Sequence, residues 1–333
     1  MENKTCGNRP LKPILALGEL LVDLVPEREN MRIRDAGAVI KTASGSAGIF
    51  ACAATLLGGQ GGFIGKVGTD SLSRMVAETL EAQGVDLSRL IVSEEGQIGL
   101  AFLEYLPEGR NYQYYRKNSV GSHLRASELD EAYIAGAYAV HFPGMLLELT
   151  PEMRGACERL VSLAREHGVL VSFDPNIRRE LASDESALAR LRWAVKNADI
   201  IAPTLDESRV ITGERDIGRV LRALHAMGPR VVALTRDKDG AVLSMDGLVA
   251  VADGIDMAPV DPTGAGDTLA AALCVGLREG MKLERLAAFC NCAGTLVITR
   301  RGAIGMALPT RAQVDEMAAS GVCRVTVTPL DRL

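Results

Sequence analysis

Asp261-Pro262-Thr263-Gly264-Ala265-Gly266-Asp267 is the most informative stretch of this 333-residue chain. Leucines recur after it about once per helical turn, which predicts a helix with one buried face. The N-terminus of such a helix presents unpaired N–H groups and the positive end of the helix dipole, and both attract an anion. Gly264 and Gly266 would let the backbone approach a phosphate closely. Asp267 could then accept a proton from an attacking hydroxyl, although the stretch alone also fits a glycine-rich turn with a capping aspartate.

Composition narrows the class of protein. Hydrophobic residues make up 47% and charged residues 24% of the chain, as in ordinary globular proteins. Aromatic residues are only 4%, whereas there are 34 glycines, which favours small-residue helices packed on aliphatic strands over an all-β sandwich. A net charge of −5 argues against a nucleic-acid-binding protein, which would normally be basic.

Cysteines and apolar runs indicate a cytoplasmic protein. The seven cysteines are scattered and odd in number, which does not fit a disulfide framework, and Cys290 and Cys292 have no second pair with which to bind zinc. The apolar segment from Ile14 to Val25 contains Glu19 and Asp23, so it does not fit a signal peptide or membrane span. We therefore expect this segment to form a buried first strand, and we expect no membrane partner.

Short aliphatic runs alternate with helical stretches along the chain. The expected strands are Ile14–Leu17, Gly62–Ile64, Ala139–His141, Leu170–Phe173, Ile200–Ala202 and Val231–Leu234. The expected helices are Gly48–Leu57, Leu72–Gln83, Pro151–His167, Asp184–Lys196, Ile217–Met227, Gly266–Arg278 and Leu283–Ile298. This alternation predicts a three-layer α/β/α, doubly wound fold with a mostly parallel sheet, within a single domain over residues 1–333.

Two segments, approximately 24–43 and 98–120, break the alternation. Gly99–Tyr105 and Asn111–Arg116 are expected to form a hairpin around Pro107-Glu108-Gly109, and this hairpin carries four of the six tyrosines. We expect both segments to form a small β-lid over one end of the sheet. A surface extension used for homodimer contact is an alternative, and the two roles are compatible.

Polar residues follow several of the expected strands. They occur in Gly18–Asp23, Asp174–Arg178, Pro203–Glu207 and Thr235–Asp237. Because ligands of open α/β sheets bind beyond the carboxyl ends of the strands, these groups predict a site at one sheet edge. The glycine-rich stretch 58–67 does not fit a Walker motif or a dinucleotide fingerprint, so it is expected to form tight turns.

Together these motifs resemble the ribokinase-like, phosphofructokinase-B-type carbohydrate kinases. The resemblance covers nearly the whole chain in order, and its most specific part is the stretch Asp261–Asp267. The other matching motifs are Gly18–Asp23, Gly65–Asp70, Asp174–Arg178 and Ala303–Thr310. The Glu-Leu-Leu-Val-Asp opening and Tyr115-Arg116 are most similar to fructokinases.

The resemblance implies a mechanism and a set of site residues. Asp267 would deprotonate a sugar hydroxyl that attacks the γ-phosphate of ATP, and the N–H groups of Gly264, Ala265 and Gly266 would form an anion hole. The resemblance assigns four residues to the substrate, Asp23, Gly45, Arg116 and Asn176, and it also places Asn176 near the phosphates. It assigns Thr235, Glu207 and Asn291 to the nucleotide, and Glu207 also to hydrated Mg²⁺. Asp261 and Thr263 would bind a monovalent cation such as K⁺.

The sequence gives partial information on the substrate. The Asp23 carboxylate accepts hydroxyl donors and repels phosphate, which favours a neutral polyol such as fructose. Arg116 could contact the sugar or be a solvated lid charge. Together with Arg32 and Arg34, it leaves an acid sugar as an alternative substrate. The alternatives are 2-keto-3-deoxygluconate, ribose or a nucleoside, or a catalytically weak relative that senses sugar.

Three positions depart from the family pattern. Ile49 stands where the family has a sugar-binding asparagine, and it cannot form that hydrogen bond. Thr204 replaces an asparagine, and Asp237 replaces a glycine that approaches the phosphates. These departures motivate the sensing alternative and weaken the assignment of the sugar more than that of the reaction.

Overall fold

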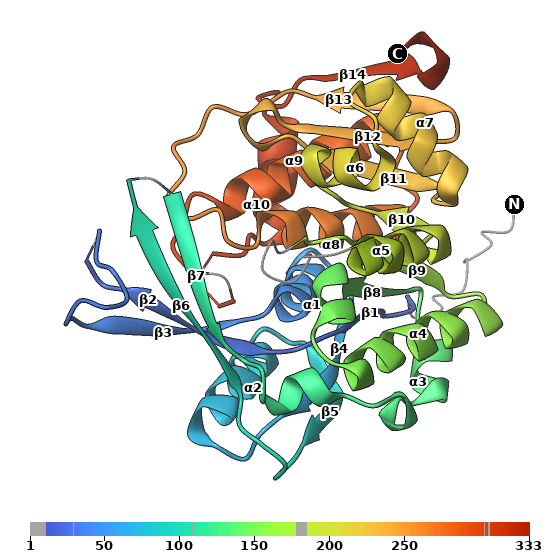
Figure 1. Cartoon of the computed structure of the whole chain (residues 1–333). Coiled ribbons are helices and arrows are strands. Elements are labelled where there is room, and N and C mark those ends of the chain that lie inside the picture. The colour runs from blue at the N-terminus through green and yellow to red at the C-terminus, as the bar shows by residue number, and fades with distance from the viewer. Residues whose placement is uncertain (1–10, 29, 108, 178–184, 303, 306) are drawn as a thin grey trace, which may run out of the picture.

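Within the computed structural model, residues 11–28, 30–107, 109–177, 185–302, 304–305 and 307–333 are described. The residues of the motifs and segments above that lie outside these ranges are Glu29, Glu108, Arg178, Asp184, Ala303 and Met306. The described residues form a large ten-stranded sheet between helices, and a smaller four-stranded sheet projects from one side of it (Figure 1).

The large sheet has the strand order β14-β13-β12-β11-β10-β9-β8-β1-β4-β5. Pairing is parallel from β11 to β5, and β12, β13 and β14 extend the sheet in antiparallel fashion. The strands are β1 (Ile14–Leu17), β4 (Gly61–Val67), β5 (Asp86–Val92), β8 (Ala139–Pro143), β9 (Leu170–Asp174), β10 (Ile200–Ile201), β11 (Val231–Thr235), β12 (Ala241–Met245), β13 (Leu248–Ala252) and β14 (Val325–Pro329). The predicted mostly parallel sheet is thus confirmed.

Helices cover both faces of this sheet. The helices are α1 (Ser46–Leu56), α2 (Ser71–Ala82), α3 (Glu131–Ala135), α4 (Pro151–Glu166), α5 (Glu185–Asn197), α6 (Leu205–Thr212), α7 (Ile217–Met227), α8 (Ala265–Arg278), α9 (Leu283–Val297) and α10 (Arg311–Ala319). Ile14 of β1 packs in a core with α1, α2, α8, α9 and α10, whereas the next residue, Leu15, packs in a second core with α3 to α7. This alternation follows from the two-residue period of a strand and confirms the three-layer fold.

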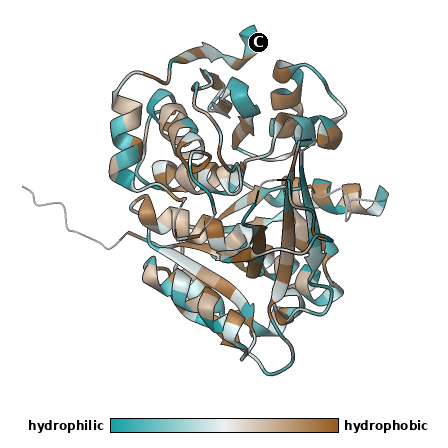
Figure 2. Cartoon of the chain, turned by 90° about the vertical axis from the view of Figure 1, so that its left-hand side faces the viewer, coloured by the Kyte–Doolittle hydropathy of each residue, from teal (hydrophilic) through white to brown (hydrophobic). Residues whose placement is uncertain are grey.

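Several helices are amphipathic, and several begin at a capping side chain. In Figure 2 such helices carry both teal and brown residues, because they have a buried face and an exposed face. Helices α1 and α8 differ, since none of their residues is exposed. Asp70, in the motif Gly65–Asp70, caps α2 by accepting hydrogen bonds from the N–H groups of Leu72 and Ser73. No helix of the described residues is long and apolar enough to span a membrane.

The smaller sheet is the expected β-lid. Its strands are β2 (Leu21–Pro26), β3 (Val39–Ser44), β6 (Gly99–Leu106) and β7 (Gly109–Tyr115), in the order β3-β2-β6-β7. Strand β2 pairs parallel with β6, and the other two pairs are antiparallel. The predicted hairpin is therefore present, whereas the assignment of residues 1–333 to one domain stays a prediction.

The expected strand Ile14–Leu17 is present as β1, but the expectation that the apolar segment Ile14–Val25 forms one buried strand was wrong. The chain leaves the large sheet after Leu17 and enters the lid at Leu21. At the junction, Gly18 lies so close to α1 that an added Cβ would be 2.5 Å from the Cβ of Ala47. The apolar residues run through this junction because both strands are buried, so hydrophobicity alone could not reveal the break.

Candidate active site

A cavity of about 260 Å³ lies between the lid and the carboxyl ends of the central strands. The ends of β1, β8, β9, β10 and β11 contribute to its wall, as the sequence predicted for an open α/β sheet. The predicted site residues that line it are Asp23, Gly45, Arg116, Asn176, Glu207, Thr235, Thr263, Gly264, Ala265, Gly266 and Asp267. Asp261 and Asn291 are not part of this wall.

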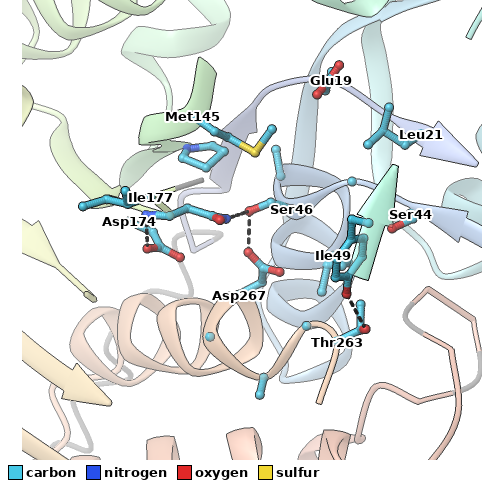
Figure 3. Close-up of a pocket in the computed structure, with 18 of the residues that line it drawn as sticks. Glu19, Leu21, Ser44, Ser46, Ile49, Met145, Asp174, Ile177, Thr263 and Asp267 are labelled. Carbon is cyan, nitrogen blue, oxygen red and sulfur yellow. Dashed lines mark hydrogen bonds between the residues drawn. The ribbon is translucent and has the colours of Figure 1, made fainter. Parts of the chain in front are cut away.

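Asp267 lies in the first turn of α8, at the floor of the cavity in Figure 3. Gly264 caps the helix in the left-handed conformation, with φ of 84°. A Cβ at Gly264 would be 3.0 Å from Cγ2 of Ile49, so both the conformation and the packing favour glycine there. The first residues of α8 therefore bring helix N–H groups and a carboxylate to the same part of the cavity, an arrangement suited to an anion beside a base.

A chain of hydrogen bonds leads to Asp267 from two other elements. Ser46, the first residue of α1, donates from Oγ to Oδ1 of Asp267. Asn176 donates from Nδ2 to the same Oγ over 3.1 Å (Figure 3). The N–H of Asn176 donates to Oδ1 of Asp174 over 3.0 Å, and Asn176 has a left-handed φ of 39°. Three segments far apart in sequence thus meet at the carboxylate.

Glu207 joins α6 to the turn after β9. Its Oε2 accepts from the N–H and Oγ1 of Thr204 over 2.8 and 3.0 Å. Its Oε1 accepts from the N–H of Ile177 over 2.6 Å. A carboxylate offers about four lone-pair sites, so Glu207 retains room for about one further donor or for a metal-bound water.

The carboxylates of Asp174 and Glu207 both line the cavity. Their oxygens suit a hard cation such as Mg²⁺, which uses few protein ligands and retains waters. Among the described residues, no cluster of three or more acidic, histidine or cysteine side chains could hold a metal on its own. The donor set fits Mg²⁺ that is shared with the phosphates of a nucleotide.

The lid hairpin is bonded to the loop that precedes α8. Tyr105 donates from its hydroxyl to Oδ2 of Asp261 over 2.9 Å, and Arg110 donates to Oγ1 of Thr263 over 3.1 Å. Asp261 also accepts from the N–H and Oγ1 of Thr263 and from the N–H of Gly302. Burial acts to raise the pKa of Asp261, but these hydrogen bonds outweigh burial and hold that pKa below its ordinary value. A monovalent cation at Asp261 and Thr263 stays a prediction.

A buried ion pair closes the cavity on the lid side. Nη1 of Arg116 lies 2.6 Å from Oε1 of Glu19, and both side chains are buried. The guanidinium of Arg116 also lies over the ring of Tyr114, 4.1 Å from its centre. Burial raises the pKa of Glu19, and Arg116 only partly opposes that effect. Arg116 is therefore a cavity residue, and its interpretation as a solvated lid charge was wrong.

Comparison with known proteins identifies the family. The model of the pfkB family carbohydrate kinases matches residues 12–311. The chain belongs to this family. It is 31% identical to probable fructokinase-5 of Arabidopsis thaliana over 324 residues, which cover 94% of this chain and 99% of that relative. This pfkB kinase is thus a sugar kinase with fructokinase-like relatives.

Solved structures share the fold. A putative ribokinase II from E. coli, in complex with ATP and Mg²⁺, has a TM-score of 0.88 at 25% identity. The alignment covers 93% of this chain and 100% of the E. coli chain. The 2-dehydro-3-deoxygluconokinase of Thermotoga maritima has a TM-score of 0.86 at 22% identity, and it covers 92% of this chain and 99% of its own.

The three departures from the family pattern have different surroundings in this pfkB kinase. Ile49 is buried, lines the cavity and packs against Gly264. Thr204 is the N-cap of α6 and forms a capping box with Glu207. Asp237 has a left-handed φ of 49°, a conformation that aspartate tolerates better than most side chains, and it does not line the cavity.

Asn291 lies apart from the cavity wall. Its Nδ2 donates to the carbonyl of Asp253 over 2.9 Å and to Sγ of Cys323 over 3.3 Å. The assignment of Asn291 to the nucleotide stays a prediction.

Some cavity residues of the kinase were given no individual role from the sequence. They are Glu19, Ser46, Arg110, Tyr112 and Asp174. Glu19 and Asp174 lie within the quoted motifs, and Arg110 and Tyr112 lie in the expected hairpin. The sequence therefore predicted the part of the fold in which these four residues lie. Ser46 carried no signal beyond its position beside Gly45, because a serine at a helix start is common.

Proposed function

We propose that this kinase transfers the γ-phosphoryl group of ATP to a hydroxyl of fructose or a similar neutral sugar, with Asp267 as the general base. The position of Asp267 carries the proposal, because it shares one cavity with the N-terminus of α8 and with the polar residues of the lid. A base acts only within hydrogen-bond reach of the proton that it accepts, and this cavity is where a sugar hydroxyl can meet a phosphate.

The chain supplies separate groups for the nucleotide and the phosphoryl group. The amides of Gly264, Ala265 and Gly266 would stabilise charge that develops on the transferred group. Asp174 and Glu207 would hold Mg²⁺ through its waters, and Thr235 would line the nucleotide side of the cavity. When bound, Mg²⁺ neutralises phosphate charge. The similar E. coli structure contains ATP and Mg²⁺, which supports these two ligands for the present kinase.

The charges near the lid favour a neutral acceptor. Arg116 is already paired with Glu19, so a substrate carboxylate would have to compete for it in a buried setting. Asp23 also lines the cavity and would repel an anionic sugar while accepting from hydroxyls. The fructokinase relative supports fructose among neutral sugars. Gly45 has a φ of 117°, and a Cβ there would lie 2.5 Å from the carbonyl oxygen of Glu19, so glycine allows this close approach at the cavity wall.

A substrate panel tests the proposal. Fructose, ribose, a nucleoside and 2-keto-3-deoxygluconate would be assayed with ATP and Mg²⁺ by coupled ADP detection, with and without K⁺. We expect the highest kcat/KM with fructose. A higher value with the acid sugar would contradict the neutral-acceptor assignment. Stabilisation by a sugar without turnover of any of them would favour the sensing alternative.

We also propose that the lid forms a homodimer contact. Val39 and Ile40 of β3 and Tyr115 of β7 are exposed on the lid, although they are large and apolar or aromatic. Replacing Ile40 with lysine should convert the dimer to a monomer in light scattering. A monomeric wild-type protein would contradict it. Location in the cytoplasm stays a prediction.

A further inference from the structure

We infer that Ser46 is a positioning residue for Asp267: it sets the orientation of the carboxylate and stabilises its ionised form. The inference rests on the proposed role of Asp267 as the base. Ser46 was not among the predicted site residues, and its hydroxyl lies between the amide of Asn176 and the carboxylate of Asp267 (Figure 3).

The chemistry of the three groups fixes the direction of the hydrogen bonds. The Nδ2 of Asn176 can only donate, so Oγ of Ser46 accepts from it. The hydroxyl has a single proton, and this proton is directed to Oδ1 of Asp267. An ionised carboxylate only accepts hydrogen bonds, so every bond in the chain favours the form of Asp267 that can take a proton.

The supports of Ser46 come from rigid parts of the fold. Ser46 begins α1, and the preceding Gly45 has a φ of 117° that a side chain rarely adopts. Asn176 is held by the bond of its N–H to Asp174, and the following Ile177 donates to Glu207. Because both neighbours are anchored, Ser46 can hold the Asp267 carboxylate in one rotation while a substrate hydroxyl approaches.

Burial makes this stabilisation necessary. Asp267 is only 8% exposed, and desolvation disfavours the charged form of a carboxyl group. A hydrogen bond to a charged group is stronger than one between neutral groups, so the Ser46 hydroxyl offsets part of this effect. Without it, the base would be protonated over a wider range of acid pH.

The test measures pH–rate profiles of Ser46 variants with the best sugar of the panel. In Ser46→Ala we expect kcat to fall about tenfold to a hundredfold, the range for losing a hydrogen bond to a charged group. The KM for sugar should change by less than about threefold, because Ser46 acts on the base. The acidic midpoint of kcat/KM should move upward by about one pH unit, since the ionised base loses a donor.

Conservative variants separate positioning from folding. Ser46→Thr retains the hydroxyl and should restore most of kcat and the wild-type midpoint, whereas Ser46→Cys, a weak donor of similar shape, should behave like Ser46→Ala. Thr55→Val is the matched control. It removes a hydroxyl from the same helix that bonds to the carbonyl of Ala51, and it should leave the pH profile unchanged.

Other charged groups remain constant across these variants. Those that line the same cavity are Asp174 from β9, Glu207 from α6, Asp23 from β2, Arg110 from β7, and the pair Glu19 and Arg116. A difference between variants therefore reports on Ser46. The inference would be overturned if Ser46→Ala kept the wild-type midpoint, or if Ser46→Thr folded without restoring it.

The outcome is distinct from failure of the proposed function. If Asp267→Asn retained the wild-type rate, Asp267 would not be the base, whatever Ser46 did. If Ser46→Ala failed to fold, Ser46→Cys would decide the question by its midpoint. A loss of melting temperature in Ser46→Cys without a shifted midpoint would show a purely structural role and would contradict the inference.

Discussion

At the scale of single residues, the properties of the site depend on the hydrogen-bond partners that each buried carboxylate has. Asp267, Asp261 and Glu19 are all buried near one cavity, yet their partners differ. Asp261 accepts from several donors of the protein, whereas Glu19 has one arginine and an Oε2 without a hydrogen-bond partner. Carboxylates near one cavity therefore have different surroundings, which suit them to the proposed base, a structural acceptor and a counter-ion.

Replacement of Asp267 by asparagine should remove the base while preserving shape. General-base catalysis contributes about 10²- to 10⁴-fold, so kcat should fall by at least about 10²-fold. Steady-state kinetics and titration calorimetry measure the rate and the sugar affinity separately. Retained affinity with lost turnover is the expected result, and a wild-type kcat would refute the assignment.

Glu19→Gln should change how stability depends on pH. The pKa of Glu19 in the folded protein is raised above its ordinary value of 4.5, so the native state holds this proton more tightly than the unfolded state. The wild type therefore loses stability from this group as pH rises above 4.5, and the glutamine variant does not. Melting temperatures of both proteins between pH 4 and pH 8 should shift progressively in favour of Glu19→Gln. A constant difference would contradict the expected titration.

At the scale of elements, the lid hairpin is fastened to the loop before α8. Tyr105→Phe removes the hydrogen bond to Asp261, and bonds to charged groups are worth about 1.5–3 kcal/mol. If lid closure completes the sugar site, the KM for sugar should rise about tenfold or more. Tyr115→Phe is the matched control in the same hairpin, because Tyr115 is exposed and its hydroxyl accepts from Gln113. Equal KM values for the two variants would contradict a role for this contact.

The start of α6 gives a second test at this scale. Thr204 forms a capping box with Glu207, so Thr204→Ala should cost about 1 kcal/mol in the free energy of unfolding. Thr204→Asn places a comparable cap there and should lower the free energy of unfolding by only about a few tenths of a kcal/mol. Urea unfolding compares the variants. A larger loss in Thr204→Asn than in Thr204→Ala would show that the cap is not the reason for this threonine.

At the scale of the whole molecule, the cavity exists only where the two sheets meet. Its wall takes residues from the large sheet, the lid and the first turns of α1, α6 and α8. A ligand that binds only the folded protein stabilises it, by about 2.7 kcal/mol at a hundredfold excess over Kd. A non-hydrolysable ATP analogue with Mg²⁺ and fructose should each raise the melting temperature, and unchanged temperatures would contradict binding here.

Much of the architecture could be predicted because its signals are local. The predicted strand Ile14–Leu17 and helix Ile217–Met227 agree with the structure residue for residue, since periodicity and capping residues mark such elements directly. The strands β5 and β12 to β14 and the helices α3, α6 and α10 were not predicted. Strands β12 and β13 form an antiparallel hairpin, and the turn that joins them has positive φ at Asp246 and Gly247. The prediction relied on the alternation of helices and strands, and a hairpin without a helix between its strands does not follow that alternation.

The sequence by itself determined the glycine-rich start of α8 and the polar residues that follow the strands. Glycine placement, helical period and strand ends are properties of neighbouring residues, so they can be read without a fold. Only the tertiary structure decided that Ser46 bonds to Asp267, 221 residues away, and that Arg116 is neutralised by Glu19, 97 residues away. Such contacts depend on the packing of separate elements, and no local pattern encodes which carboxylate a distant hydroxyl or guanidinium will meet.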